Sequence, residues 1–371
     1  MSNKWSIPAI YFTKIENRQK MLNRKLSSHI VTAGPRGNGG INSVIEAYAR
    51  FFHPFHSITT VRGGNILCKA AQILSALFFV LWYRTVKHCS VFHVHSACYR
   101  SFYRKKLLAT FAKTLGYKVI FHIHGAEFKV FTEQAGKTMI ASFLAKCDKV
   151  IALSEEWKEY FEHELQLVNV ECIPNIIPNP VLNITPHETD KIRLLFLGAI
   201  GKRKGIFDLM ELLAEHKEWA DDVELHIGGD GETGKLLDFI HRNNMEKNVF
   251  FYGWVKGEEK VKLFKQCNVY ILPSYFEGVP ISILEAMNYS LPIISTDVGG
   301  IPSIVQHGKN GFLFTPGDKE VMRQAISHFL QDRSLITALG QESFEQTRPH
   351  LPESVEKKLT SIYAIMQKAE G

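Results

Sequence analysis

Residues 268–287, NVYILPSYFEGVPISILEAM, combine a short apolar strand, a loop and the first turns of a helix. The strand ends near Ser274, and the helical pattern begins near Ile281. A strand that leads through a loop into a helix is the repeating unit of a parallel α/β sheet. The N–H groups at the start of such a helix favour an anion, and a diphosphate is one example. The stretch therefore predicts an α/β fold with a ligand site at the carboxyl ends of its strands.

The same alternation extends in both directions along the chain. Further short apolar strands, separated by helical patterns, are predicted at 29–34, 91–96, 118–125, 149–154, 193–200, 223–230, 248–254, 291–297 and 311–318. Residues 175–190, rich in Asn and Pro, interrupt this rhythm and predict a linker. We therefore expect two doubly wound Rossmann-like domains, 1–185 and 186–350, facing across a cleft, followed by a C-terminal segment, 351–371. Within this segment, residues 352–368 have apolar positions at helical spacing and predict an amphipathic helix.

Composition and charge narrow the function classes. The 371 residues are 45% hydrophobic and 22% charged, which excludes collagen-like and intrinsically disordered proteins. Residues 1–185 carry 23 Lys and Arg against 11 Asp and Glu, whereas residues 186–371 carry 21 against 26. A basic half suits an anionic partner, such as nucleic acid, a phosphorylated acceptor or the inner leaflet of a membrane, or it is a solvated surface. The six cysteines are scattered without a C-x-x-C pair, as in a reduced, cytoplasmic protein.

The most apolar run is AAQILSALFFVLWY at residues 70–83, flanked by Lys69 and Arg84. Its 14 residues are fewer than the roughly 20 that a spanning helix needs. Two interpretations remain: a buried helix, or a hydrophobic face that enters a membrane surface. The N-terminus is charged and interrupted by Pro8, so we expect no secretory signal.

Two glutamates mark the 275–287 segment as a candidate site. Glu277 lies in the loop, where its carboxylate suits the hydroxyls of a polyol, and Glu285 lies within the helix, where it suits a ribose. An ordinary surface helix with solvated glutamates is the alternative. The amides expected to point toward an anion or sugar hydroxyls are those of Gly278, Val279, Ile281 and Ser282.

A second loop, within FLGAIGKRKGIFDL (196–209), contains Lys202, Arg203 and Lys204. Cations beside a helix N-terminus stabilise the charge of a departing diphosphate. Gly-rich turns at 34–42, 227–232, 295–305 and 307–314 allow the backbone to approach a ligand closely. The turn at 34–42 lacks the dinucleotide pattern G-x-G-x-x-G with a later acid, which disfavours a nicotinamide oxidoreductase.

Histidines occur at i, i+2 in two predicted strands: His93 with His95, and His122 with His124. No carboxylate or thiol is placed by the sequence to complete a metal site, and there is no D-x-D motif. We therefore predict no metal. His124 ends its strand, where a cleft would open, and is predicted to contact substrate, whereas His122 is expected in the core.

An ordered set of motifs resembles the retaining family 4 (group 1) glycosyltransferases over residues 28–345. These motifs are GG-I-N (39–42), HIHG (122–125), IPN (173–175), FLG…KG (196–205), GGDG (228–231), PS..EG.P.S.LEAM (273–287), PIISTDVGGIP (292–302) and NGFLF (310–314). The resemblance implies the GT-B fold, with the donor sugar nucleotide held mainly by the C-terminal domain and the acceptor mainly by the N-terminal one. It also implies that the final helix crosses back to the first domain.

The resemblance further implies roles for individual residues. Glu277 matches the glutamate that contacts the donor sugar, Glu285 the ribose-binding one and Lys204 the diphosphate-binding lysine. His124 resembles the histidine beside the anomeric centre. Gly39 and Gly40 match the phosphate-facing turn, and Gly253 to Val255 match the turn near the base. The family often has an arginine directly after FLG, where this chain has Ala199; Arg203 or Lys202 would have to replace it.

Together these features predict a retaining, metal-independent hexosyltransferase that uses a UDP- or GDP-linked sugar and no cofactor. The expected acceptor is a lipid-linked or oligosaccharide molecule in bacterial capsule or lipopolysaccharide synthesis, and no nucleic acid is involved. The expected location is cytoplasmic, peripheral at the inner membrane face. The alternatives are a weakly active or inactive sugar-nucleotide-binding relative, motivated by Ala199, and a non-hydrolysing sugar-nucleotide epimerase.

Overall fold

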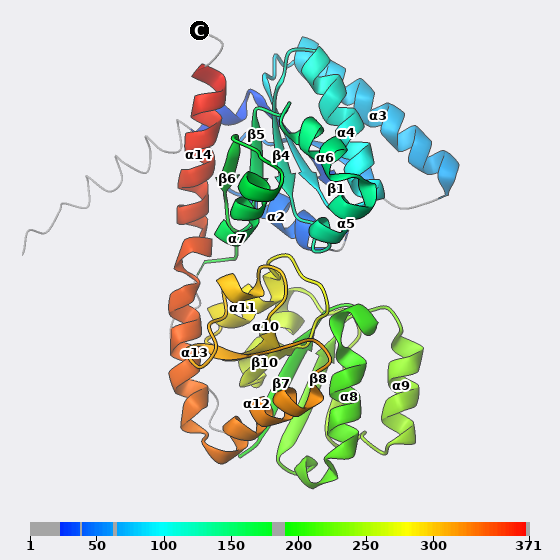
Figure 1. Cartoon of the computed structure of the whole chain (residues 1–371), viewed down its shortest axis with the longest axis vertical. Helices are drawn as coiled ribbons and strands as arrows, with labels where there is room; N and C mark the ends of the chain where they lie inside the picture. The colour runs from blue at the N-terminus through cyan, green and yellow to red at the C-terminus, as the bar shows by residue number, and fades with distance from the viewer. Residues whose placement is uncertain (1–22, 38, 62–64, 180–189, 369–371) are drawn as a thin grey trace, which may run out of the picture. The chain divides into compact units, whose positions relative to one another are not determined.

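The computed structural model describes residues 23–37, 39–61, 65–179 and 190–368. Their contacts divide them into two compact units. The first unit comprises the described residues up to Ala152, Lys158–Ile173 and those from Val355, and the second comprises Leu153–Trp157 and Pro174–Ser354. Figure 1 shows both units and labels many of their helices and strands.

The first unit is built on a six-stranded sheet in the order β2-β1-β3-β4-β5-β6, and every pairing is parallel. Its central strands are buried along almost their whole length, as expected for a sheet covered on both faces. The strands are β1 (Ile30–Pro35), β2 (His56–Val61), β3 (Val91–Ser96), β4 (Lys118–Ile123), β5 (Lys149–Ala152) and β6 (Val170–Cys172).

Helices connect these strands, and one helix joins the unit from the far end of the chain. The helices are α2 (Gly40–Tyr48), α3 (Ile66–Thr85), α4 (Arg100–Thr114), α5 (Phe128–Ala135), α6 (Lys137–Leu144) and α14 (Pro352–Lys368), while α7 (Glu155–Glu159) is divided between the two units. Helix α14 buries Val355, Leu359, Ile362 and Met366, which confirms the amphipathic pattern predicted for 352–368. Its Tyr363 packs edge-on against Phe52 of the first unit.

The second unit repeats the design with the sheet order β12-β11-β10-β7-β8-β9, again parallel throughout. Its strands are β7 (Ile192–Leu197), β8 (Val223–Gly228), β9 (Val249–Phe251), β10 (Val269–Leu272), β11 (Ile293–Thr296) and β12 (Gly311–Phe314). Its helices are α8 (Ile206–Glu215), α9 (Thr233–Arg242), α10 (Gly257–Gln266), α11 (Ile281–Asn288), α12 (Lys319–Gln331) and α13 (Ser334–Gln346). These two parallel sheets confirm the predicted pair of doubly wound, Rossmann-like folds.

The predicted strands agree with the observed ones because their apolar runs are the buried centres of the sheets. In the second unit, β7 pairs with β8 over six consecutive residues, and Leu194, Leu195 and Phe196 are fully buried. Part of the predicted linker, residues 180–189, lies outside the described residues. The described part of it contains Asn175 and Ile177, which are buried within the second unit.

The apolar run at 70–83 forms the middle of helix α3, and its environment contradicts the interpretation as a buried helix. Ala76 and Val80 are buried, but Leu74 and Phe78 are exposed to 67% and 61%. The outer face of this helix is therefore apolar and unburied. A hydrophobic pattern alone predicts a helix but does not tell how many of its faces have partners.

Candidate functional site

The strand order of the second unit predicts a ligand site at the carboxyl ends of β7 and β10. These strands are neighbours, and from them the chain proceeds outward in opposite directions, to β8 and β9 on one side and to β11 and β12 on the other. In parallel α/β sheets, ligands bind at such a reversal of strand order, beyond the carboxyl ends of the strands. The loops at that position are those at 198–205 and 273–280, which contain the predicted residues Lys204 and Glu277.

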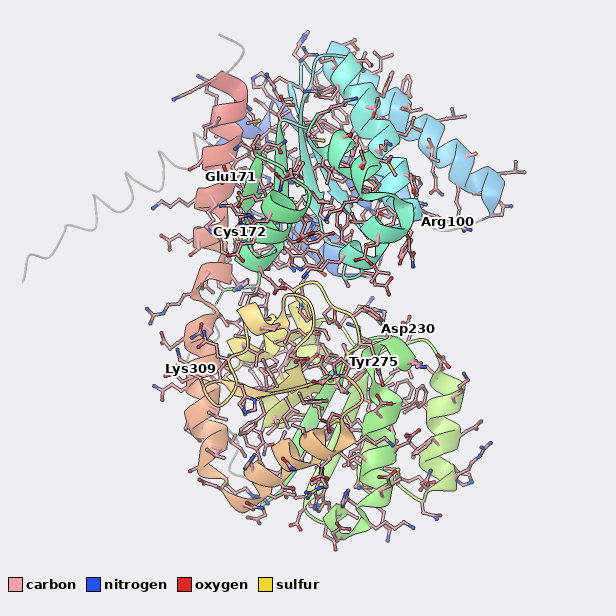
Figure 2. The ribbon with its side chains drawn as sticks, viewed as in Figure 1. Arg100, Glu171, Cys172, Asp230, Tyr275 and Lys309 are labelled. Atoms are coloured by element: carbon pink, nitrogen blue, oxygen red, sulfur yellow. The ribbon has the colours of Figure 1, made fainter. Side chains whose placement is uncertain are left out.

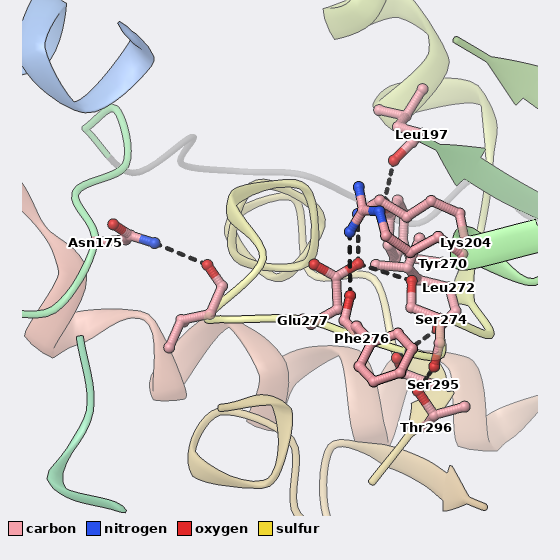
Figure 3. A network of polar contacts seen from close by, with 12 residues as sticks. Asn175, Leu197, Lys204, Tyr270, Leu272, Ser274, Phe276, Glu277, Ser295 and Thr296 are labelled. Atoms are coloured by element: carbon pink, nitrogen blue, oxygen red, sulfur yellow. Dashed lines mark hydrogen bonds and ion pairs between the residues drawn. The ribbon is translucent and has the colours of Figure 1, made fainter. Parts of the chain in front are cut away.

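Lys204 and Glu277 meet at this point in a buried ion pair, shown in Figure 3. Their side chains are exposed to only 13% and 7%, and the ammonium Nζ contacts the carboxylate Oε1. The Ser274 hydroxyl donates a second hydrogen bond, of 2.7 Å, to the same oxygen. A charge-assisted contact in a low-dielectric site is stronger than a neutral hydrogen bond. The cluster therefore holds one carboxylate and one ammonium in fixed positions at the strand ends.

Two glycines allow the loops around this pair to approach one another. At Gly205, φ is +67°, and a Cβ atom would lie 1.9 Å from the carbonyl oxygen of Pro273. At Gly299, φ is +57°, and a Cβ would lie 1.8 Å from the carbonyl oxygen of Glu277. Both positions need a left-handed backbone and the absence of a side chain. Gly205 and Gly299 thus allow two backbone segments to lie in direct contact.

Arg203 lies on the same loop as Lys204 and reaches the segment beside Glu277. Its guanidinium Nη1 donates a 3.2 Å hydrogen bond to the carbonyl of Phe276, and its own carbonyl accepts one of 2.9 Å from the N–H of Tyr275. Ala199 lies on the surface of this loop. The contact with Phe276 places the guanidinium of Arg203 next to the residue that precedes Glu277. Figure 2 shows Tyr275 of this segment at the same end of the second unit as Asp230.

Glu285 lies on α11 and has a partner that the sequence did not suggest. Its Oε1 accepts a 2.6 Å hydrogen bond from the ammonium of Lys260 on α10, and the two side chains are exposed to 17% and 30%. No short-range pattern in the sequence relates these residues, since they are 25 positions apart and on different helices. Ser274 was likewise missed as a partner of Glu277, although it stands only three residues before it.

The remaining predicted residues of the second unit line the same end of the sheet. Helix α11 begins at Ile281, and the N–H groups in the first turn of an α-helix have no acceptor within the helix. These include the amides of Ile281 and Ser282, while Gly278 and Val279 form the preceding loop. The Val279 carbonyl accepts a 2.7 Å hydrogen bond from the Asn175 side chain, which fixes that loop. The arrangement suits an anion at the helix N-terminus.

The predicted turn near the base connects β9 and α10. Gly253 has a φ of +67°, and its carbonyl accepts a 2.7 Å hydrogen bond from Gly229, which follows β8. Val255 is buried against Gly228, where a Cβ would approach its methyl group to 2.6 Å. Gly253 and Val255 are therefore packed against the end of β8, one strand away from β7.

Gly39, Gly40 and His124 belong to the first unit. Gly39 is the N-cap of helix α2, four residues after the end of β1, and Gly40 is the first residue of that helix. The sheet of this unit also reverses its order, between β1 and β3, so this turn lies where a ligand crevice is expected. His124 follows β4, and its N–H donates a 2.8 Å hydrogen bond to the carbonyl of Ser96. The structure thus divides the predicted site residues between the two units.

His124 is part of a stacked cluster with His93, His95 and His122. Hydrogen bonds of 2.9 Å and 3.3 Å join His95 to His124 and His93 to His122, and the hydroxyl of Tyr363 lies 2.7 Å from Nδ1 of His93. Burial lowers the pKa of His93 and of His124 to about 3, and it lowers those of His95 and His122 well below the ordinary value. The four imidazoles are therefore neutral at pH 7.

The nitrogens that could serve as metal ligands are those of His93, His95 and His122, which lie within 4.8 Å of one another. The third ligand that the sequence lacked is thus another histidine. Three neutral imidazoles are a ligand set that binds zinc in other proteins. The expectation of no metal therefore stays a prediction.

Comparison with known families gives the same assignment over both units. The family model described as Glycosyltransferase Family 4 matches residues 21–178, and the one described as Glycosyl transferases group 1 matches residues 182–346. Among curated proteins, the chain is 31% identical over 186 residues to a lipopolysaccharide 1,6-galactosyltransferase of Salmonella typhimurium, covering 48% of this chain and 51% of that one. The chain spans about a third to a half of the length of several such relatives.

Solved structures show the same fold. Sucrose-phosphate synthase from Thermosynechococcus elongatus matches with a TM-score of 0.73 at 18% identity, covering 92% of this chain and 99% of that one. HepE from Anabaena, solved with UDP and glucose, matches with a TM-score of 0.71 at 15% identity, covering 91% and 99%. Two parallel Rossmann-like sheets and two adjoining family matches lead to one conclusion: the chain belongs to the group 1, family 4 glycosyltransferases with the GT-B fold.

Proposed function

We propose that the chain transfers a hexosyl unit from a nucleotide diphosphate sugar to a sugar-containing acceptor, with retention at the anomeric carbon. The observation that carries this proposal is the buried Lys204–Glu277 pair at the carboxyl ends of β7 and β10, beside the N-terminus of α11. A donor needs one group for its diphosphate and another for its sugar hydroxyls. Lys204 and the helix amides suit the first, and Glu277 suits the second.

The reaction breaks the bond between the anomeric carbon and the β-phosphate oxygen, and it forms a bond from that carbon to an acceptor oxygen. The acceptor's proton passes to the departing phosphate on the same face of the sugar, so that configuration is retained. Negative charge grows on the diphosphate as it leaves. Lys204, Arg203 and the first amides of α11 stabilise that charge in place of a metal. Glu277 orients the sugar through its hydroxyls, and Glu285 binds the ribose.

The family often has an arginine at the position of Ala199. In this chain Arg203 is proposed to supply that positive charge instead. Its hydrogen bond to the Phe276 carbonyl keeps the guanidinium next to the Glu277 loop. This placement of Arg203 supports an active enzyme rather than an inactive relative that only binds sugar nucleotides. His124, neutral at pH 7, is proposed to contact the transferred sugar as a hydrogen-bonding group and not as a cation.

The donor nucleotide and the acceptor are proposed from relatives. HepE was solved with UDP, which supports a UDP-linked donor ahead of a GDP-linked one. The Salmonella galactosyltransferase acts on lipopolysaccharide, which supports an acceptor in bacterial surface polysaccharide synthesis. The basic charge of residues 1–185 suits an acceptor with a lipid diphosphate or an anionic oligosaccharide at the inner face of a membrane. The proposed location is therefore cytoplasmic and peripheral.

A thermal-shift panel with UDP, GDP, ADP, TDP and their common sugar conjugates tests the donor site. A ligand at about 100 times its dissociation constant stabilises the folded state by roughly 2.7 kcal/mol. We expect a shift with uridine compounds that disappears in Lys204→Met. Release of UDP from the matching donor, with acceptor present, then reports transfer. Isomerised donor formed without acceptor would point to an epimerase, and no shift with any nucleotide would refute the donor site.

A further inference from the structure

Helix α3 presents a continuous apolar stripe to solvent. Leu67, Leu74, Phe78 and Leu81 recur at spacings of seven, four and three residues, which places them on one face of the helix. They are exposed to 79%, 67%, 61% and 42%. Single exposed apolar side chains are ordinary on protein surfaces, but a row of large ones along a 20-residue helix marks an interaction surface.

The opposite face of α3 packs against the rest of the first unit. Ala76 and Val80 are buried, and the hydroxyl of Tyr117 donates a 2.9 Å hydrogen bond to the Val80 carbonyl. Near the end of the helix, the Arg84 guanidinium donates to the carbonyls of Leu115 and Cys89. Residues 67–85 are long and apolar enough to cross a membrane, with a mean hydropathy of 1.2. A helix fixed along one side to a parallel sheet cannot cross a bilayer without unfolding that unit, so α3 can only lie along a surface.

The sequence on both sides of this stripe is basic. Between Glu46 and Glu127 it has 11 Lys and Arg residues and no Asp or Glu. Lys105 is buried, and Lys113 and Lys118 form ion pairs with Asp148, so the remaining cations carry the argument. Lys87, just after α3, is exposed, and so is Arg100 at the start of the neighbouring helix α4, labelled in Figure 2. Helices α3 and α4 pack against each other, and α4 also exposes Tyr103 and Leu107. Apolar side chains with basic surroundings match an anionic lipid surface in both chemistry and charge.

We propose that α3 is a membrane-surface anchor, which lies in the plane of an anionic bilayer with its Leu67–Leu81 stripe among the lipid acyl chains. Headgroup phosphates then neutralise the surrounding lysines and arginines. A second copy of the chain would instead bring two basic surfaces together, with repulsion between like charges. The proposal deepens the proposed function, because a lipid-linked acceptor would be met at this surface. Its test needs neither donor nor acceptor.

The test is flotation of the full chain with vesicles of phosphatidylcholine alone, or of equal parts phosphatidylcholine and phosphatidylglycerol. We expect binding to the anionic vesicles that weakens as salt is raised, since exposed charges are screened. Leu74→Glu should weaken this binding by about tenfold or more, because it places a charge in the stripe. The matched control is Leu237→Glu on α9 of the second unit, where a leucine exposed to 51% receives the same charge and binding should be unchanged. Both sites are exposed, and thermal unfolding checks that both variants fold.

Several outcomes would overturn the proposal. These are no binding of the wild-type chain to anionic vesicles, equal losses in Leu74→Glu and Leu237→Glu, or resistance of bound protein to alkaline carbonate extraction, which marks a spanning helix. A wild-type dimer in light scattering that Leu74→Glu dissociates, without vesicle binding, would assign the stripe to a second copy. Since donor binding is measured separately by thermal shift, failure here leaves the glycosyl-transfer proposal intact.

Discussion

Replacing Lys204 by methionine would leave the Glu277 carboxylate buried with only the Ser274 hydroxyl beside it among its described partners. Removing one member of a buried ion pair typically costs 3–5 kcal/mol, because the remaining charge has lost its compensation. The exposures of 13% and 7% place this pair in that class. We expect Lys204→Met to lower the free energy of unfolding by about 3 kcal/mol. For a protein of 371 residues, that loss corresponds to a fall in Tm of roughly 4 °C.

The double variant Lys204→Met/Glu277→Gln separates the cost of an unpaired buried charge from the cost of lost side-chain packing. The double variant leaves no member of this pair charged. Its loss of unfolding free energy should therefore be about 2 kcal/mol smaller than the sum of the losses in the two single variants. The control is Lys260→Met, which removes the more exposed pair with Glu285 and should cost about 1 kcal/mol or less. Urea unfolding of the four variants and the wild type gives these values.

The same substitution should impair the reaction. Removing a group that stabilises the charge of the leaving diphosphate typically costs about 10²-fold or more in turnover. We therefore expect Lys204→Met to reduce kcat by that factor at saturating donor, at a temperature where the variant remains folded. Strictly additive stabilities in the cycle, together with an unchanged kcat, would refute both the buried pair and the catalytic role of Lys204.

Three other outcomes are expected. Gly299→Ala should abolish the thermal shift by the donor, because its Cβ would lie 1.8 Å from the Glu277 carbonyl oxygen; an undiminished shift would contradict this loop geometry. EDTA should leave activity intact, and loss that Mn²⁺ restores would overturn the metal-independent mechanism. Burial lowers the pKa of His93 to about 3 from the value of 6.5 expected in the unfolded chain, so the unfolded state binds more protons between these pH values. Stability should therefore decline as pH falls below 6.5, and His93→Asn should reduce that slope by about 1.4 kcal/mol per pH unit; an unchanged slope would count against a neutral buried His93.

Much of the fold follows from the sequence because its signals are local. Apolar runs of four to six residues, each followed by a helical pattern, predict parallel strands wherever they occur, and β7 and β10 lie where the pattern places them. Glu277 and Lys204 could also be predicted as site residues, since the strand-loop-helix context shows which loops lie at the carboxyl ends of strands.

Contacts between distant segments required the tertiary structure. Lys204 and Glu277 are 73 residues apart and meet only because β7 and β10 are neighbours, and strand order is not encoded in periodicity. The pairing of Glu285 with Lys260 depends likewise on how two helices pack. Helix α3 shows the same limit, since an apolar residue looks identical in sequence whether its face meets a sheet or solvent. Local periodicity thus determined the elements and the candidate residues, whereas the packing of elements decided which of those residues touch and which face is left uncovered.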